Sequence, residues 1–411
     1  MWNQLQSIAL RFPRLRLHKL LSLSAKTSFH LPCRDRRLSS THASHDKKSI
    51  YILGVGSIGK LFAHSLAKSS SAPPVTLLLH RPELAVDCDK AGGCIEVVKN
   101  GSADKQCGFQ TEVILQKGGD TSTHEIITNL IVVTKAQATV PALQPLKHRL
   151  TNESTILFLQ NGLGVTEEVT ARIFPNPSSR PQYLAGITTH GAYPTAPFSI
   201  VHAGIGTATV GAFLPPEDSG QQGIIVEDPV ASIPANSRYL IQQILKAPAL
   251  AATAVTPEQL LRARLEKLVI NATVNPLTVI FNRHNGQLFG RPPIRVLIQR
   301  LLTEVSAVIR ALINYKGNTM DSRFSEPALE KHVERVATFN SKGINSMLQD
   351  VRAGKETEID YINGYIVARG AELGIQCPHN RKVVEMVKNG HVISESQISD
   401  FFPHIEGTEY H

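Results

Sequence analysis

The sequence predicts an α/β protein in which a doubly wound parallel sheet is followed by a mostly α-helical C-terminal domain. The apolar run 49–53 leads straight into a glycine turn at Gly54–Gly59. Further apolar runs follow at spacings long enough for crossover helices, at 75–79, 130–133 and 155–159. Strands that alternate with helices after a glycine turn are typical of a Rossmann-type sheet.

Composition divides the 411 residues into five segments. A basic leader is followed by the α/β domain, a linker or insert rich in Pro, Gly, Ser, Asp and Glu, the helical domain and a tail; these cover 1–48, 49–214, 215–237, 238–395 and 396–411. The glycine-rich stretch 200–211 is expected to close the α/β domain as a hairpin.

Apolar residues recur with helical spacing in the C-terminal domain. This pattern predicts helices over 295–315 and 358–373, the second ended by Gly374.

The net charge of +9 is concentrated at one end of the chain. Residues 1–48 hold ten Lys or Arg and two acidic residues, which accounts for +8, so the body is nearly neutral and does not favour a nucleic-acid partner. Residues 1–34 contain no acid and many serines, as in a mitochondrial transit peptide. We therefore expect a mitochondrial matrix protein, cleaved after Leu38; a basic tail on a cytoplasmic protein is the alternative.

Two absences restrict the class of protein. No run of 18 apolar residues occurs, which excludes a membrane-spanning helix. The cysteines form no C-x-x-C pair, so we expect reduced thiols in an intracellular compartment and no structural metal; they are Cys33, Cys88, Cys94, Cys107 and Cys377.

The glycine turn has the G-x-G-x-x-G pattern of a dinucleotide-binding loop, with a strand before it and a helix after it. Glycines permit the tight turn and let backbone N–H groups approach a pyrophosphate at the helix N-terminus. The predicted cofactor-binding residues are Gly54, Val55, Gly56, Ser57, Ile58 and Gly59.

The residues after the second strand indicate which dinucleotide is bound. An NAD site places an acid there, but this chain has His80 and Arg81, and an arginine can pair with the 2′-phosphate of NADP. Glu83 and Asp87 lie near enough to keep NAD open, and a strand-end arginine is often only a solvated charge.

A narrow polar stripe is predicted on one helix of the C-terminal domain. Lys267, Asn271 and Asn275 recur at i, i+4 and i+8, between mostly apolar residues. One lysine and two amides suit a site that accepts oxygen atoms, whereas the alternative is a buried helix whose amides bond to neighbouring backbone. The pKa of Lys267 could move either way, because burial lowers it and a nearby anion raises it.

From about residue 50 to 388 the chain resembles the ketopantoate reductases (2-dehydropantoate 2-reductases). The matching motifs, in order, are G-V-G-S-I-G at 54–59, T-K-A at 134–136, L-Q-N-G-L-G at 159–164, T-T-H-G-A at 188–192, the lysine–asparagine helix, N-G-Q-L at 285–288, and S-M-L-Q-D-V-R-A-G-K-E-T-E-I-D-Y-I-N-G at 346–364.

The resemblance implies a role for each matching residue. Lys267 would be the general acid, and Glu358 would orient the substrate hydroxyl and the lysine, although its position at the start of a predicted helix also suits an ordinary first-turn acid. Asn271, Asn275, Asn285 and Ser346 would bind substrate. Lys135 and Asn161 would reach the nicotinamide-ribose side of the cofactor, with Ala192 in a cofactor-contacting stretch and Arg81 at the 2′-phosphate.

The activity that the resemblance implies is the NADPH-dependent reduction of ketopantoate to pantoate for pantothenate and coenzyme A biosynthesis. Two alternatives stay open: a reductase of another 2-keto acid, and a non-catalytic relative that supports mitochondrial translation or RNA. The expected partner is a small 2-keto acid, with a homodimer left open. Extra residues at 104–123 and in the 215–237 insert have no assigned role.

Overall fold

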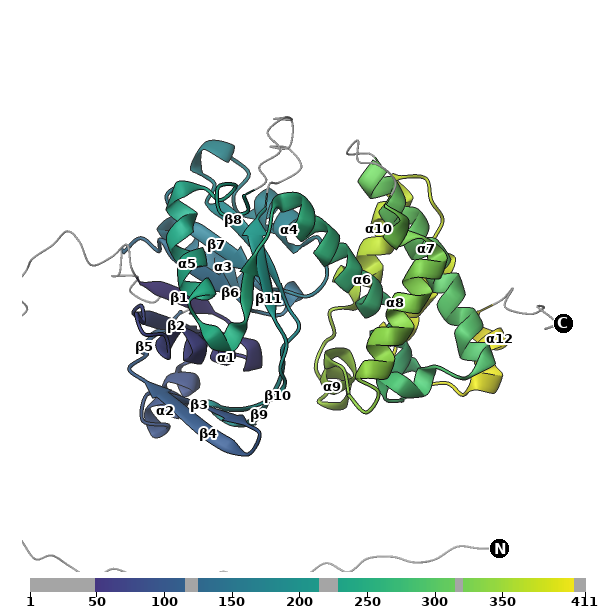
Figure 1. Ribbon diagram of the computed structural model, residues 1–411, viewed down its shortest axis with the longest axis horizontal. Coiled ribbons are helices and arrows are strands. Elements are labelled where there is room, and N and C mark those ends of the chain that lie inside the picture. Colours follow the sequence, from purple (N-terminus) through teal and green to yellow (C-terminus); the bar gives the residue numbers. More distant parts are fainter. Residues whose placement is uncertain (1–48, 115–124, 214–227, 315–320, 403–411) are drawn as a thin grey trace, which may run out of the picture. The chain divides into compact units, whose positions relative to one another are not determined.

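A mainly parallel eight-stranded sheet forms the centre of the N-terminal domain of the computed structural model, which describes residues 49–114, 125–213, 228–314 and 321–402 (Figure 1). In spatial order its strands are β12 (Ala252–Ala254), β11 (Ala208–Ala212), β8 (Gln182–Thr188), β7 (Thr155–Phe158), β6 (Asn129–Val132), β1 (Ile50–Leu53), β2 (Val75–Leu79) and β5 (Gln110–Val113).

The strand order contains a switch point beside β1. From β5 to β8 all neighbours are parallel, and β11 runs antiparallel to β8. The chain proceeds from β1 outward to β2 and β5, then returns to the other side of β1 as β6. This order and the parallel pairing confirm the predicted α/β fold. In sheets of this kind, ligands bind at the switch point, outside the carboxyl ends of the strands.

Helices cover both faces of the sheet, and the central strands β1, β2, β6 and β7 are buried on both sides as a result. One apolar cluster joins the sheet to α1 (Ser57–Ala67) and α5 (Arg238–Leu245). The other joins it to α3 (Ala136–Leu143) and α4 (Val165–Arg172).

A second sheet has the order β4-β3-β10-β9 and corrects the expected hairpin at 200–211. Its strands are β3 (Cys94–Lys99), β4 (Ser102–Cys107), β9 (Gly191–Ala196) and β10 (Ser199–Gly204). β10 belongs to this sheet and β11 to the large one, so the chain changes sheets between them. Gly206 lies in this link, where a Cβ would come within 2.4 Å of the Thr189 hydroxyl.

The expectation of reduced cysteines is wrong for one pair. Cys94 and Cys107 face each other across the β3–β4 hairpin with Cα atoms 4.0 Å apart, and they form a disulfide. Cys88 and Cys377 are free and buried. Cys33 lies outside the described residues.

The C-terminal domain is helical around one apolar core, as predicted. Its helices are α6 (Pro257–Ile280), α7 (Pro292–Asn314), α8 (Glu326–Phe339), α9 (Ser346–Arg352), α10 (Asn363–Glu372), α11 (Pro378–Lys388) and α12 (Ile398–Phe401). The longest, α6, begins with Pro257 and a capping box between Thr256 and Gln259. It packs on β8 and β11 as well as on α7, α8, α9 and α11.

Three expected boundaries move in the structure. Residues 238–254 form α5 and β12 of the sheet domain, so the helical domain begins at α6 rather than at 238. Ile398 and Phe402, placed in the tail, are buried in the helical core. The helix expected from Glu358 is a short 3₁₀ turn, Ile359–Tyr361, followed by α10, and Gly374 follows with a positive φ of 72°. The leader lies outside the described residues, as do 115–123 and 215–227 of the two insertions.

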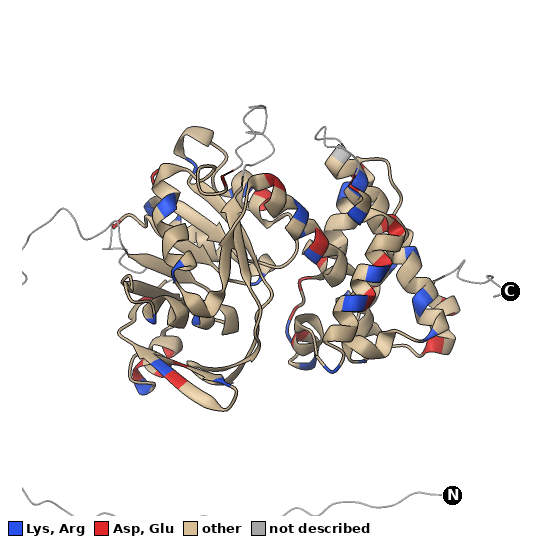
Figure 2. Cartoon of the chain, viewed as in Figure 1, with Lys and Arg blue, Asp and Glu red and all other residues tan. Residues whose placement is uncertain are grey.

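Residues of opposite charge are interspersed on the helices, and charged residues are nearly absent from the strands of the large sheet (Figure 2). Within the described ranges, no helix is long and apolar enough to cross a membrane.

Candidate functional site

The glycine turn after β1 contains two glycines that have no room for a side chain and a third that has open space beside it. Gly54 has a φ of 105°, and a Cβ there would come within 2.6 Å of the Thr134 backbone nitrogen. A Cβ on Gly59 would come within 2.0 Å of the Gly54 carbonyl oxygen. A Cβ on Gly56 would meet nothing within 4 Å, so this glycine leaves an open cradle at the N-terminus of α1, which no side chain caps. The residues therefore fit a pyrophosphate.

Arg81 follows the end of β2, the strand beside β1, by two residues and is the N-cap residue of α2 (Pro82–Lys90). Its side chain is exposed and makes no ion pair within the described part of the chain. His80 is exposed beside it, and its pKa is lowered by partial burial and by the Arg81 charge. A cationic group thus stands at the strand end where Rossmann-type domains read the ribose of the cofactor.

Lys267 is held by a backbone carbonyl at the end of β8. Its Nζ donates to the Thr188 carbonyl oxygen at 2.9 Å. Burial lowers the pKa of Lys267 from 10.5 to about 8, although the negative charge of Glu358 opposes the shift. Of the two opposing effects on the pKa of Lys267 that the sequence left open, burial is the larger. A lysine with this pKa can exchange a proton near neutral pH.

Glu358 from the helical domain is fixed by the loops that follow β6 and β7. Its Oε1 accepts the backbone N–H of Ala136 at 3.0 Å, at the start of α3. Its Oε2 accepts the Asn161 side-chain amide at 3.1 Å and lies 3.8 Å from Lys135 Nζ. The acid therefore complements the N-terminus of α3 rather than that of its own helix.

Two motifs that are distant in the sequence form one contact. Leu163 N–H donates to the Tyr361 carbonyl oxygen at 2.8 Å. Gly162 has a φ of 78°, and a Cβ there would come within 2.2 Å of the same oxygen. Lys135 also forms an ion pair with Asp350 of α9. The loops of the sheet domain are thus tied to the helical segments that carry Asp350 and Glu358.

The four predicted substrate-binding residues fall into two groups. Asn271, Asn275 and Ser346 make no side-chain hydrogen bond with any residue that the structure describes. In contrast, the Asn285 side chain donates to the Asn340 carbonyl oxygen at 3.3 Å and accepts from Asn345 at 3.0 Å. Polar groups without protein partners are available to a ligand.

Asn345 is one of the residues that the sequence analysis missed. Its side chain also donates to Thr278 and caps α9 at Leu348. Asp350, Thr188 and Ala136 were also missed by the sequence analysis. Each lies inside a motif quoted above, but the motif does not indicate which of its atoms makes the contact. The remaining predicted residue, Ala192, lies on β9 opposite His202.

Comparison with known proteins assigns the family. Residues 50–215 match the ketopantoate reductase family PanE/ApbA, and residues 259–391 match its C-terminal domain. A probable 2-dehydropantoate 2-reductase of Schizosaccharomyces pombe is 30% identical over 346 residues, covering 83% of this chain and 96% of that protein. This chain belongs to the ketopantoate reductase family.

Other relatives in the comparison carry a different name. A ketoisovalerate reductase of Beauveria bassiana is 26% identical over 410 residues, covering 87% of each chain. The crystal structure of 2-dehydropantoate 2-reductase from Geobacter metallireducens has the same fold, with a TM-score of 0.65 and 21% identity over 83% of this chain and 99% of that one.

As a member of this family the chain is an oxidoreductase that uses a nicotinamide dinucleotide. The open cradle at Gly56 and the uncapped N-terminus of α1 are the features that would hold its pyrophosphate. Within the described residues, no group of three or more His, Cys, Asp and Glu side chains is suited to a metal ion.

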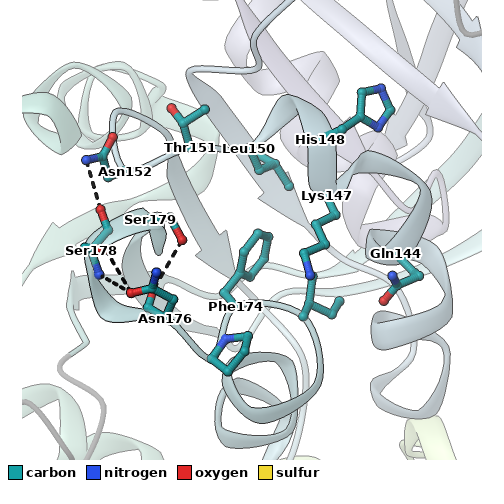
Figure 3. Close-up of a pocket in the computed structure, with 12 residues that line it drawn as sticks. Gln144, Lys147, His148, Leu150, Thr151, Asn152, Phe174, Asn176, Ser178 and Ser179 are labelled. Carbon is teal, nitrogen blue, oxygen red and sulfur yellow. Dashed lines mark hydrogen bonds between the residues drawn. The ribbon is translucent and has the colours of Figure 1, made fainter.

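A hollow of about 650 Å³ lies away from these residues (Figure 3). It is lined by segments that precede β7 and β8, including Lys147, His148 and Phe174. It therefore opens at the amino ends of the parallel strands, whereas the glycine turn is at their carboxyl ends. Hydrogen bonds among Asn152, Asn176 and Ser178 shape its wall, and it includes none of the predicted site residues.

Proposed function

We propose that this chain reduces 2-dehydropantoate to pantoate with NADPH, in the pathway to pantothenate and coenzyme A. The observation that carries the proposal is the placement of Lys267, which is held on the Thr188 carbonyl and has its pKa lowered to about 8 by burial, within the electrostatic influence of the buried Glu358 carboxylate. The same helix carries Asn271 and Asn275, whose side chains have no hydrogen-bond partner among the described residues. The names of the curated relatives support this substrate.

Lys267 is the proposed proton donor. The cofactor, when bound, supplies a hydride to the keto carbon, and negative charge then develops on the carbonyl oxygen. The Lys267 ammonium neutralises that charge and gives its proton to the oxygen, leaving a hydroxyl group and a neutral amine. The Thr188 carbonyl holds the amine at the end of β8 during this step.

The other residues orient the two reactants. Asn271, Asn275, Asn285 and Ser346 would hold the substrate carboxylate and its distal hydroxyl, so that one face of the keto group is presented. Glu358 would accept from that hydroxyl and keep the lysine charged. Lys135, Asn161 and Ala192 would contact the nicotinamide-ribose side, and the exposed Arg81 would bind the 2′-phosphate, which favours NADPH over NADH.

A second substrate is favoured by a specific observation, because relatives at 26–28% identity are named ketoisovalerate reductases. 2-Ketoisovalerate is a 2-keto acid that lacks the distal hydroxyl. A site that hydrogen-bonds a substrate hydroxyl rejects the analogue lacking it by about 10⁴–10⁵-fold at best. Discrimination between the two acids therefore reports whether the hydroxyl is read.

The test measures kcat/KM for both acids by following NADPH absorbance with purified residues 39–411. The proposal expects ketopantoate to be the better substrate by at least tenfold. A higher value for 2-ketoisovalerate would replace the substrate assignment. NADPH binding without turnover of either acid would favour a non-catalytic relative.

We also propose that residues 1–48 direct the protein to the mitochondrial matrix. Their excess of basic over acidic residues and their interleaved leucines support this address. A fluorescent protein carrying these residues should enter mitochondria, and the same leader with Arg11, Arg14 and Arg16 changed to Gln should not. Cytosolic fluorescence with the unaltered leader would contradict the proposal.

A further inference from the structure

Pro276, near the C-terminal end of α6, leaves one backbone carbonyl of the helix without its usual N–H donor. A helical residue normally donates its N–H to the carbonyl four residues earlier, but proline has no N–H and its ring displaces that carbonyl. The affected carbonyl belongs to Ala272, which is fully buried. A buried carbonyl without a partner is unfavourable, so another donor is required here.

Asn363, the first residue of α10, supplies this donor. Its Nδ2 lies 2.8 Å from the Ala272 carbonyl oxygen and 2.9 Å from Asn380 Oδ1. Both asparagines are fully buried. The Asn363 Oδ1 atom has no partner, and turning the amide over would place it against two oxygens. The amide is thus oriented by the two acceptors that it satisfies.

Asn380 is in turn anchored by a carboxylate. Glu304 of α7 accepts the Asn380 side-chain amide at 2.7 Å and its backbone N–H at 2.9 Å. The other oxygen of Glu304 accepts from the backbone and ring of His379. A chain of buried hydrogen bonds therefore runs from α7 through α11 and α10 to α6, and α11 also packs on the other three helices.

These hydrogen bonds lie close in the sequence to the proposed reactive groups. Ala272 lies between Asn271 and Asn275 on α6, and Asn363 lies five residues after Glu358. The bond between Asn363 and Ala272 therefore joins the segment that carries Glu358 to the helix that carries Lys267. Misplacement of reacting groups by about 1 Å can cost about 10²-fold in rate.

We propose that Asn363 is a positioning residue whose side-chain amide replaces the N–H missing at Pro276, thereby fixing Glu358 relative to Lys267, Asn271 and Asn275. The positioning role rests on the proposed function, whereas the coupling between Asn363 and Pro276 does not.

The coupling predicts a specific suppressor. In Pro276→Ala the helix regains an N–H that can bond the Ala272 carbonyl, so Asn363 becomes less important. We expect Asn363→Ala to lower kcat/KM for the keto acid about 10- to 100-fold, mainly through a higher KM. In the Pro276→Ala background the same substitution should cost less than about threefold. Fluorescence titration should give an unchanged Kd for NADPH in all variants, because the cofactor loop is not touched.

Two further variants serve as controls for the comparison of Asn363→Ala in the wild-type and Pro276→Ala backgrounds. Asn389→Ala removes an exposed asparagine from the same domain and should alter neither KM nor thermal stability. Asn363→Asp keeps the size but faces two oxygens with a carboxylate, so it should be more damaging than Asn363→Ala. Equal losses for Asn363→Ala in the two backgrounds would overturn the proposal, as would an unchanged keto-acid KM.

Amide hydrogen exchange separates this proposal from the proposed function. Peptides covering 268–275 should exchange faster in Asn363→Ala and return towards the wild-type rate in the double variant. This result is expected even if the wild-type chain reduces neither keto acid, in which case the coupling stands and the assigned activity fails. If Asn363→Ala does not fold, the double variant must fold, and its failure to do so would overturn the coupling.

Discussion

The glycine loop after β1 and the helix α6 offer a ligand different kinds of group. The loop offers backbone groups at its three glycines. A Cβ would clash with neighbouring backbone at Gly54 and Gly59, and at Gly56 it would fill the open cradle. α6 instead carries the polar side chains of Lys267 and Asn271, which are half-buried, and of Asn275, which is buried. The cofactor half of the site thus depends on shape, and the substrate half on specific functional groups, so substitutions in the two halves should fail in different ways.

The largest expected effect is in the substrate half. Lys267→Ala removes the proton donor and should lower kcat by about 10²–10⁴-fold. The NADPH Kd, measured by fluorescence titration, should stay unchanged, because Lys267 lies outside the glycine loop. Lys342→Ala, an exposed lysine of the same domain, is the control. A wild-type rate for Lys267→Ala would remove it from the proposed role.

Next in size is the expected side-chain contact to the 2′-phosphate of the cofactor. Arg81→Ala removes charge-assisted hydrogen bonds to the 2′-phosphate, so the NADPH Kd should rise about 10- to 100-fold. The Kd for NADH, which lacks that phosphate, should change less than about twofold. Lys90→Ala on the same helix controls for loss of positive charge. Equal weakening of both cofactors would contradict the assignment.

Substitution of the glycines tests the backbone half directly. Gly56→Ala should leave thermal stability nearly unchanged, because its Cβ meets no atom, but should raise the NADPH Kd about tenfold by filling the cradle. Gly59→Ala should destabilise the fold by about 1–3 kcal/mol, since its Cβ would overlap the Gly54 carbonyl. Similar melting temperatures for the two variants would show that the loop is not constrained as described.

The smallest effect distinguishes Asn271, whose side-chain amide has no hydrogen-bond partner among the described residues, from Asn285, whose amide is bonded. Asn271→Ala should raise the keto-acid KM about tenfold without changing the melting temperature. Asn285→Ala should also lower the melting temperature, because its side chain is bonded to Asn340 and Asn345. Loss of stability in Asn271→Ala would mean that its amide has a structural partner after all.

The sequence predicted the sheet, the glycine turn and the stripe on α6 because each depends on local spacing. Predictions that required pairing between distant segments were less successful. The β10–β11 hairpin was wrong because glycine-broken strands do not reveal which sheet they join. The start of the helical domain was misplaced because α5 has an amphipathic pattern that suits either domain.

The disulfide was missed although a local signal was present. Asn100 and Gly101 both have positive φ and form a two-residue turn that pairs Lys99 with Ser102. Counting outward from this turn places Cys94 opposite Cys107. Cysteine spacing alone carried no such information. In the same way, the partners of Glu358 come from two other segments, and no local pattern identifies the N–H of Ala136 as one of them.

The central claim is that Lys267 donates the proton with a pKa governed by burial and Glu358. Its most direct test is the pH dependence of kcat/KM for ketopantoate reduction in the wild type and in Glu358→Gln. The protonated lysine is present below its pKa, so the wild-type value should be level at low pH and fall about tenfold per pH unit above about 8. Removing the Glu358 charge should move this limb to lower pH. A wild-type profile that stays level to pH 10, or limbs that coincide in the two proteins, would contradict the account.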